Sequence, residues 1–259
     1  MENASKALIM AGGMLLAILI VTLLIYAWSL FSKYQSSKDD LADIEDTAKF
    51  NEQFANYDRE NVQGYELLSL VNKVIDYNYR KSNDANAKND EKYKPITIKI
   101  NLGNDNYRKK LTKDDTIRLF TNATYIQSNT VNTFGNILTG ANGMQQIESD
   151  YGGADCATKI AKSIDSIFLS DAQIERNKTK GKTEEESWND AIKVFNSYSL
   201  KTKVNTKADL LGQKNKAYRY YEYVQFKRAK FDSVAESVKY DTITGRIYQM
   251  EFTFTGELY

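Results

Sequence analysis

The apolar positions of this chain form one uninterrupted run near its start, followed by shorter groups with helical or alternating spacing. Within Ala7–Ser32, a run of 26 residues, Tyr26 is the only ionisable side chain. A helix rises about 1.5 Å per residue, so this run is longer than the hydrocarbon core of a bilayer, about 30 Å. The apolar region of a signal peptide is usually about 7 to 15 residues long, and Ile25 is too large for cleavage after Ala27. The pattern predicts an uncleaved transmembrane anchor over residues 1–33.

Residues 34–60 are predicted to continue the anchor as a juxtamembrane helical stem. Ser36 and Asp39 have the spacing of a capping box, which would mark a helix start. Two apolar groups fall on nearly opposite sides of this helix, namely Leu41, Ile44 and Ala48, and then Phe50, Phe54 and Tyr57. Either the helix breaks near Thr47, or one continuous helix contacts different neighbours along its length.

Residues 61–259 are predicted to form one α+β head of several helices and a C-terminal antiparallel sheet. After Gly64, apolar residues at helical spacing predict a core-facing helix: Leu67, Leu68, Val71, Val74 and Ile75. Behind the only proline of the chain, alternating isoleucines predict a half-buried strand: Ile96, Ile98 and Ile100. The predicted fold class is therefore α+β, with an N-terminal transmembrane helix and a helical stem.

The section 112–212 is predicted to be mainly helical. A short helix is expected at 114–120, a second around Cys156, and a third after a capping box from Thr183 to Glu186. Residues 175–186 are expected to form an exposed loop. The predicted core of the head contains apolar residues from helices and strands along the whole head: Leu68, Val71, Ile75, Ile98, Ile164, Phe168, Phe195 and Phe252.

A basic and aromatic segment, Lys214–Lys230, carries six cations and a single anion, Glu222. Its mixture of tyrosine with lysine and arginine would suit stacking on single-stranded nucleic acid. The alternation equally suits a covered strand that leads into the final hairpin, with Tyr221 on one face and Tyr220 on the other. We favour packing and expect no nucleic-acid partner, because the whole chain balances 35 basic against 34 acidic residues.

The chain offers little for catalysis, because it contains no histidine. Ser-His-Asp and Cys-His catalysis and most zinc sites are thereby excluded. Cys156 is the sole cysteine, so an internal disulfide is impossible, and we expect it to pack on an apolar helix face. Glycines at 139–143 and 151–155 suggest turns, without the spacing of a phosphate-binding loop. Adjacent carboxylates such as Asp114 and Asp115 point apart on a helix. We expect a non-catalytic protein without cofactor or metal, and an enzyme is the third interpretation.

The charges on the two sides of the anchor differ. Before it, the α-amino group and Lys6 stand against Glu2, a small positive excess, whereas the segment from Lys33 to Glu60 holds four basic and eight acidic residues. An acidic segment is repelled by the anionic cytoplasmic leaflet. Lys33 and Lys38 argue weakly for the opposite orientation. The balance favours a single-pass protein of the cell membrane, with a cytoplasmic N-terminus and the head outside.

Two pairs of small residues in the anchor have the spacing that lets helix backbones approach closely in lipid. They are Ala7 with Ala11, and Gly13 with Ala17. These pairs predict association of the anchor with copies of itself or with pilin-like partners. A plain lipid-facing anchor, with the membrane as its only partner, is the alternative.

An apolar N-terminal helix, a helical stem and a head ending in a sheet together resemble the ladle architecture of type IV pilin-like proteins. The passage VQGYELLSLVNK, Val62–Lys73, is similar to a helix start in small pseudopilin-like proteins. Between Leu8 and Leu30 no acidic residue occurs, so the resemblance does not include a prepilin peptidase motif. It implies a membrane-anchored pilin-like or secretion-apparatus structural subunit. The alternative is an anchored extracytoplasmic binding or adhesion module that does not assemble.

Overall fold

A computed structural model of the chain describes residues 2–84, 94–114, 117, 119–120, 123–126, 143–198, 200–201 and 203–258, with the side chains of 123–126 excepted. The chain divides into two compact units, Met1–Gln53 and Phe54–Tyr259. The first unit is a single helix. The second is a mixed α and β head.

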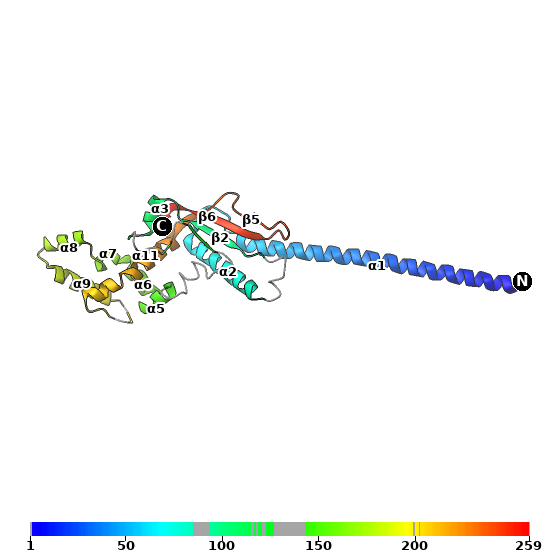
Figure 1. Ribbon diagram of the computed structural model, residues 1–259, viewed down its shortest axis with the longest axis horizontal. Helices are drawn as coiled ribbons and strands as arrows, with labels where there is room; N and C mark the ends of the chain where they lie inside the picture. Colours follow the sequence, from blue (N-terminus) through cyan, green and yellow to red (C-terminus); the bar gives the residue numbers. More distant parts are fainter. Residues whose placement is uncertain are drawn as a thin grey trace. The chain divides into compact units, whose positions relative to one another are not determined.

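The first unit consists of helix α1, which runs from Glu2 to Ala55 and so extends slightly into the second (Figure 1). The helix does not break at Thr47, so the continuous alternative is the correct one. Ser36 lies inside the helix, and the expected helix start there is wrong. No glycine or proline occurs between Lys33 and Gln53, so nothing in the sequence interrupts the backbone hydrogen bonds.

The head alternates strands and helices along the chain. Its elements are β1 (Val62–Gln63), α2 (Gly64–Asn83), β2 (Thr97–Asn101), α3 (Asp105–Leu111), β3 (Ala123–Ile126), α5 (Met144–Asp150), α6 (Ala154–Lys162), α7 (Ile164–Ile167), α8 (Asp171–Lys178), α9 (Glu184–Asn196), α10 (Lys207–Gly212), α11 (Lys214–Arg228), β4 (Ala229–Ser233), β5 (Lys239–Tyr240) and β6 (Ile247–Leu258). Of the predicted helix at 114–120, residues 115, 116 and 118 lie outside the described residues, and the other four are not helical. Of the predicted turn at 139–143, only Gly143 is described. The predicted loop at 175–186 is wrong at both ends, because residues 175–178 belong to α8 and residues 184–186 belong to α9.

The sheet is mixed rather than antiparallel. Its strands lie in the order β1-β4-β6-β2-β3, and β5 also pairs with β6. The two C-terminal pairings, β4 with β6 and β5 with β6, are antiparallel as predicted. Strand β2, however, runs parallel to β6, with Ile98 opposite Met250. The physical reason is the long helical crossover between these two strands, since parallel neighbours need such a connection.

The core of the head lies between the sheet and the helices α2 and α11. Alternate residues of β6, Met250, Phe252 and Phe254, are buried, and α2 buries its apolar face. All predicted core residues are buried except Ile75, which is half-buried while Val74 points inward. Ile75 lies one position away from the inward face of a helix that turns by about 100° per residue.

The start of α2 shows why the chain places a glycine there. A Cβ atom at Gly64 would lie 1.7 Å from the backbone oxygen of Phe226 in α11. Only a residue without a side chain allows these two helices to approach so closely. Farther along α2, the buried side chain of Asn78 donates to Ile96 O at 2.9 Å and accepts from Ile96 N at 3.0 Å. This pair of bonds ties α2 to the chain entering β2.

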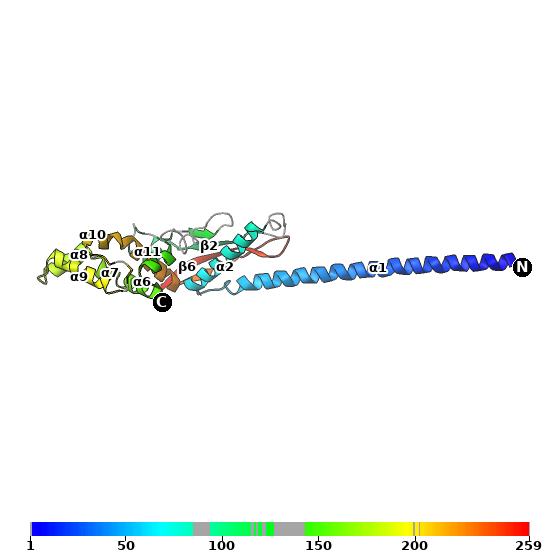
Figure 2. The same ribbon diagram turned by 90° about the horizontal axis from the view of Figure 1, so that it is seen from below.

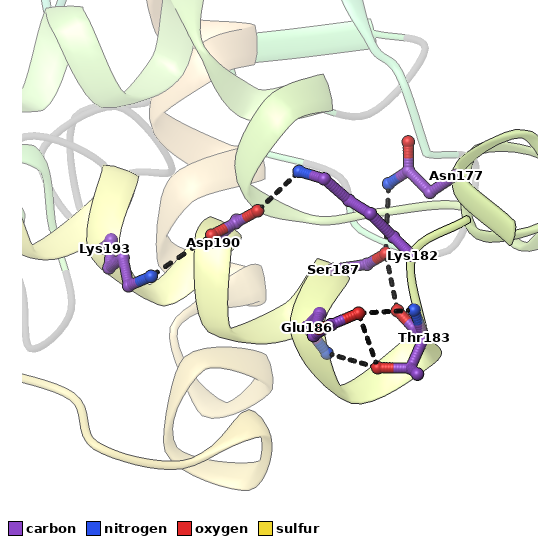
Figure 3. Close-up of polar contacts among 7 residues, drawn as sticks. All are labelled: Asn177, Lys182, Thr183, Glu186, Ser187, Asp190 and Lys193. Carbon is purple, nitrogen blue, oxygen red and sulfur yellow. Dashed lines mark hydrogen bonds and ion pairs between the residues drawn. The ribbon is translucent and has the colours of Figure 1, made fainter. Parts of the chain in front are cut away.

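Helices α5 to α10 form a helical group that α11 connects to the sheet (Figure 1, Figure 2). The predicted capping box of α9 is confirmed: Thr183 Oγ1 accepts from Glu186 N at 3.1 Å, and Glu186 Oε2 accepts from Thr183 N at 2.7 Å (Figure 3). Asp190 pairs with Lys182 at 2.7 Å and with Lys193 at 3.3 Å. These local contacts fix α9 where its apolar residues face the core.

The segment that we expected to be a strand is mostly the helix α11. Only its last residues belong to β4, so the prediction was wrong over Lys214–Arg228. Every third residue faces the core: Ala217, Tyr220, Tyr223 and Phe226. Tyrosine is frequent in strands, but here tertiary packing around the helix decides its conformation.

Candidate functional site

The most distinctive surface of the protein is the apolar side of α1. Among the described residues, α1 is the one helix long and apolar enough to cross a membrane, and none of its apolar window is buried. Leu8 and Leu24 expose 78% and 65% of their surface. Such a helix fits a membrane span or a signal sequence, and it does not serve as a core helix of the described protein.

The polar groups within this run are compatible with a lipid environment. Thr22 Oγ1 donates to the backbone oxygens of Ile18 and Leu19, at 3.0 and 2.9 Å. The hydroxyl is therefore satisfied inside its own helix, as hydrocarbon surroundings require. At the N-terminal end, Lys6 pairs with Glu2 at 3.1 Å.

Beyond the apolar run, α1 carries a line of exposed apolar residues that we call the stem seam: Tyr34, Leu41, Ile44 and Ala48. Tyr34, Leu41 and Ala48 are seven residues apart, and Ile44 lies between the last two. This is the spacing of a coiled-coil seam. The exposed fractions of Tyr34, Leu41 and Ile44 are 65%, 66% and 65%. The first unit is a single helix, so no other element of that unit covers this seam.

Charged residues flank the stem seam on both sides. Lys33 and Asp40 lie along one flank, and Lys38 and Glu45 lie along the other. Glu45 also pairs with Lys49 of its own helix at 2.7 Å. This hydrogen bond lowers the pKa of Glu45 and raises the pKa of Lys49, so both groups stay charged at neutral pH.

The small residues predicted to mediate helix association all lie on exposed α1. Ala7 and Ala11 are about 40° apart around the helix, as are Gly13 and Ala17, but the two pairs lie on different sides, roughly 120° apart. A Cβ atom at Gly13 would meet nothing within 4 Å. Gly13 falls on the line of the stem seam, three heptads before Tyr34. Association through these residues stays a prediction.

The other candidate groups lie apart from one another. Asp114 pairs with Lys214 at 3.1 Å, and Asp115 lies outside the described residues. Cys156 is half-buried on α6. In the part of the chain that the structure describes, no three Cys, Asp or Glu side chains are grouped to hold a metal ion.

The basic segment is not a free cationic face. Besides the ion pair of Lys214 with Asp114, Lys216 pairs with Asp150 at 2.8 Å and Lys230 with Glu257 at 2.7 Å. Half of its six cations are therefore neutralised by acids of other elements. This arrangement serves packing better than it serves a phosphate backbone.

A residue that the sequence interpretation passed over is Glu222 in α11, which is fully buried. Its Oε2 accepts from the backbone nitrogen of Leu119 at 2.6 Å. Burial raises the pKa of this carboxyl to about 7, although the amides of Leu119 and Phe120 and the cations Arg108 and Arg219 act in the opposite direction. The available signal was a single acid within a strongly basic segment. Glu222 holds the chain that leads into β3.

No protein-family model, curated protein or solved structure matches this chain. The resemblance to pilin-like proteins therefore rests on the layout and residues of the sequence itself. Helix α1 has the clearest physical requirement for a partner, because its long apolar run is exposed to solvent.

Proposed function

We propose that this chain is a single-pass, membrane-anchored structural subunit of the pilin-like or secretion-apparatus kind, with a non-catalytic head. Copies associate side by side through α1. The observation that carries the proposal is the combination, on one unbroken helix, of a membrane-length apolar run and an exposed stem seam beyond it.

Lipid would cover the apolar run of α1 but not the stem seam. The apolar run Ala7–Ser32 suits a bilayer, whereas the stem seam lies on the polar side of Lys33. A solitary helix of this composition is marginal in water, since most helices are stabilised by packing of an apolar face. A neighbouring helix with the same spacing supplies that packing through interdigitating side chains.

The flanking charges indicate how two copies would align. Membrane anchoring makes the copies parallel. In register, Lys33 would meet Lys38 of the neighbour and Asp40 would meet Glu45, so every flanking pair would be like-charged. A shift of one heptad places Lys33 beside Glu45 and Asp40 beside Lys38, leaving only Asp40 beside Glu52 as a like-charged pair. Charge complementarity therefore favours a staggered neighbour.

The anchor has room for such a stagger. Its 26 residues span about 39 Å as a helix, which exceeds the hydrocarbon core by about 9 Å. A shift of seven residues is about 10 Å. The excess falls only about 1 Å short of this shift, a mismatch that a bilayer accommodates at small cost, so two staggered copies can both remain in it. Because the two copies are shifted, the pair is not closed by two-fold symmetry, and the ends of the seam that the shift leaves unpaired stay available to further copies.

The proposed orientation places the N-terminus in the cytoplasm and the head outside. It is supported by the excess of acids after Lys33, which an anionic cytoplasmic leaflet would repel. Protease added to intact spheroplasts should digest the head and leave a small N-terminal fragment. A fully protected chain would reverse the orientation, and a mature N-terminus near Trp28 would refute retention of the anchor.

Cysteine crosslinking between copies tests the assembly. In a Cys156→Ser background, membranes containing both Leu41→Cys and Ala48→Cys chains should form crosslinks between positions 41 and 48 more readily than 41 to 41. Asp46→Cys, on the opposite side of the helix, is the control and should crosslink weakly. Dominant 41-to-41 crosslinks would indicate a closed, in-register pair, and no crosslink at any position would favour the solitary binding module.

A charge variant tests the stagger by a different route. Lys38→Gln removes one partner of Asp40 and should weaken the 41-to-48 crosslink severalfold. Gln53→Glu changes the net charge equally but lies away from the stem seam, and it should leave the crosslink unchanged. Equal effects of the two variants would contradict the proposed alignment.

A further inference from the structure

A pocket opens in the helical group of the head, away from the sheet. Its volume is about 310 Å³, large enough for a small metabolite. The walls come from the end of α5, from α9, from the chain that follows α9, and from the junction of α10 with α11. Several elements distant in sequence therefore converge on one space.

The inner wall of the pocket is aromatic and rigid. The rings of Tyr151 and Phe195 meet edge to face, with centroids 6.0 Å apart, and both side chains are buried. Val204 extends this apolar wall and is itself 5% exposed. A flat ring can pack against such a surface with little loss of side-chain freedom.

The rim of the pocket carries an excess of positive charge. Lys216 pairs with Asp150 at 2.8 Å, and Gln146 also donates to Asp150 at 2.8 Å, so both oxygens of this carboxylate are occupied. Lys201 is different, because its ammonium donates to the neutral Ser149 Oγ at 2.6 Å and, among the described residues, forms no ion pair. The rim thus carries two cations, Lys201 and Lys216, against one anion, Asp150.

A neutral donor, the Tyr151 hydroxyl, lines the same pocket as Lys201. The Tyr151 hydroxyl contacts Gln213 O at 3.4 Å, which is long for a hydrogen bond between oxygens. Burial raises the pKa of the phenol, with the charge of Asp150 acting in the same direction, so Tyr151 remains a protonated donor at physiological pH.

From this geometry we propose that the pocket binds a small organic monoanion that carries a planar ring. The carboxylate of the ligand pairs with Lys201 and accepts from the Tyr151 hydroxyl, while the ring packs on Phe195 and Val204. The pocket consists only of head residues, so this inference goes beyond assembly through α1 and does not depend on it.

The opposing interpretation is a water-filled gap between helices. Such a gap would bind anionic and neutral ring compounds equally weakly, because it would have no preference for charge. The excess cation at the rim and the aromatic inner wall predict a clear preference for anions instead. The comparison between an acid and its amide therefore separates the two interpretations.

The experiment uses the full chain in lipid nanodiscs, with empty nanodiscs as the blank. Benzoate, phenylacetate and indole-3-acetate are titrated calorimetrically beside benzamide, phenylacetamide and indole-3-acetamide. We expect at least one acid to bind, with its amide at least about tenfold weaker. Lys201→Gln should reduce the affinity for that acid by about tenfold. Lys193→Gln, on the exposed side of α9, should leave it unchanged.

A filled pocket provides the second variant. Val204→Trp places an indole in the space that the ligand ring would occupy, and it should abolish binding while the head still melts cooperatively. Absence of binding by all three acids at about 10 mM would overturn the proposal. Equal affinity for acid and amide, or equal loss in Lys201→Gln and Lys193→Gln, would also overturn it. The exposed Lys201 forms no ion pair among the described residues, so its variant is expected to fold even if Val204→Trp does not.

Discussion

The two units of the chain contain the same kinds of apolar side chains but expose them very differently. In Met1–Gln53, Leu8 and Leu24 are 78% and 65% exposed. In Phe54–Tyr259, Leu67 is 0% exposed. The head covers its apolar residues with its own sheet and helices, whereas the first unit is one helix and has no second element of its own. The difference teaches that the stability of the head is internal, while the first unit depends on what surrounds it.

The largest expected effect comes from placing charge in the apolar run. Leu16→Asp combined with Leu19→Asp should disfavour membrane insertion by about 5 to 7 kcal/mol, since each aspartate near the helix centre costs about 2.5 to 3.5 kcal/mol. Membrane flotation should find the variant in the soluble fraction, and circular dichroism should show that the head melts as in the unaltered chain. The alanine pair at the same positions is the control. A charged variant that still floats with the membrane would mean that α1 is not the anchor.

A glycine-to-alanine substitution should lower the stability of the head when it is made at Gly64, and it should leave that stability unchanged when it is made at Gly12 in the first unit. Gly64→Ala introduces a Cβ atom 1.7 Å from the backbone oxygen of Phe226, so α2 and α11 must move apart. We expect a loss of about 3 kcal/mol or more in the free energy of unfolding of the head. Gly12→Ala is the matched control, because a Cβ atom there meets nothing within 4 Å. Similar denaturation midpoints for both variants would contradict the tight contact between α2 and α11.

The buried Glu222 gives the head a pH dependence that arises from burial, whereas the shifted groups of α1, Glu45 and Lys49, are exposed. The pKa of Glu222 in the folded head is about 7, above its ordinary value of 4.5, so the folded state retains the proton more tightly than the unfolded state. Its contribution to stability is therefore fully present below about pH 4.5 and is lost as the pH rises through about 7. The size of this loss is roughly 2 to 3 kcal/mol.

Glu222→Gln should remove this contribution while keeping an oxygen that accepts from Leu119. Acids such as Asp150, whose pKa is lowered by its hydrogen bond to Lys216, have the opposite pH dependence. Their contribution to the stability of the head is lost as the pH falls. The measured quantity is therefore the difference in unfolding free energy between the variant and the unaltered chain from pH 4 to 8. A constant difference across this range would show that Glu222 does not titrate there.

The smallest effect concerns a helix start in the head. Thr183→Ala removes the side-chain oxygen that accepts from Glu186 N, and it should cost about 1 kcal/mol of unfolding free energy. Thr179→Ala is the control, because that hydroxyl donates only to Arg176 O of its own helix, at 2.8 Å. Urea denaturation of both variants should separate them, and equal stability would contradict the capping role of Thr183.

The parts that could be predicted from the sequence have strong local signals. The long apolar helix near the N-terminus follows from its length and composition, and the start of α9 follows from the capping box of Thr183 and Glu186. Strand β2 follows from the alternation of its isoleucines behind a proline. In each case, a few neighbouring residues determine the local structure, so no distant contact is needed to predict it.

The parts that could not be predicted depend on distant contacts. The tyrosines of α11 surround the helix on several sides, so its sequence has little helical periodicity and resembles a strand. The parallel pairing of Ile98 with Met250 joins residues far apart in the chain. The burial of Glu222 could not be predicted either, because a lone acid between cations usually marks an exposed face. The stem seam, by contrast, was recognisable from the spacing of Leu41 and Ile44.

The central place of β6 in the sheet has a consequence for how the protein is made. Strand β6 is the last strand in chain order, yet β2 and β4 both pair with it, on either side. Until Ile247–Leu258 has emerged, these two strands have exposed edges and the aromatic residues of β6 are missing from the core. Contacts of such long sequence separation form late and slowly. In the orientation that we propose, a chain held at a membrane by α1 would therefore cross it with an open head, and the head would close only after its final strand had emerged.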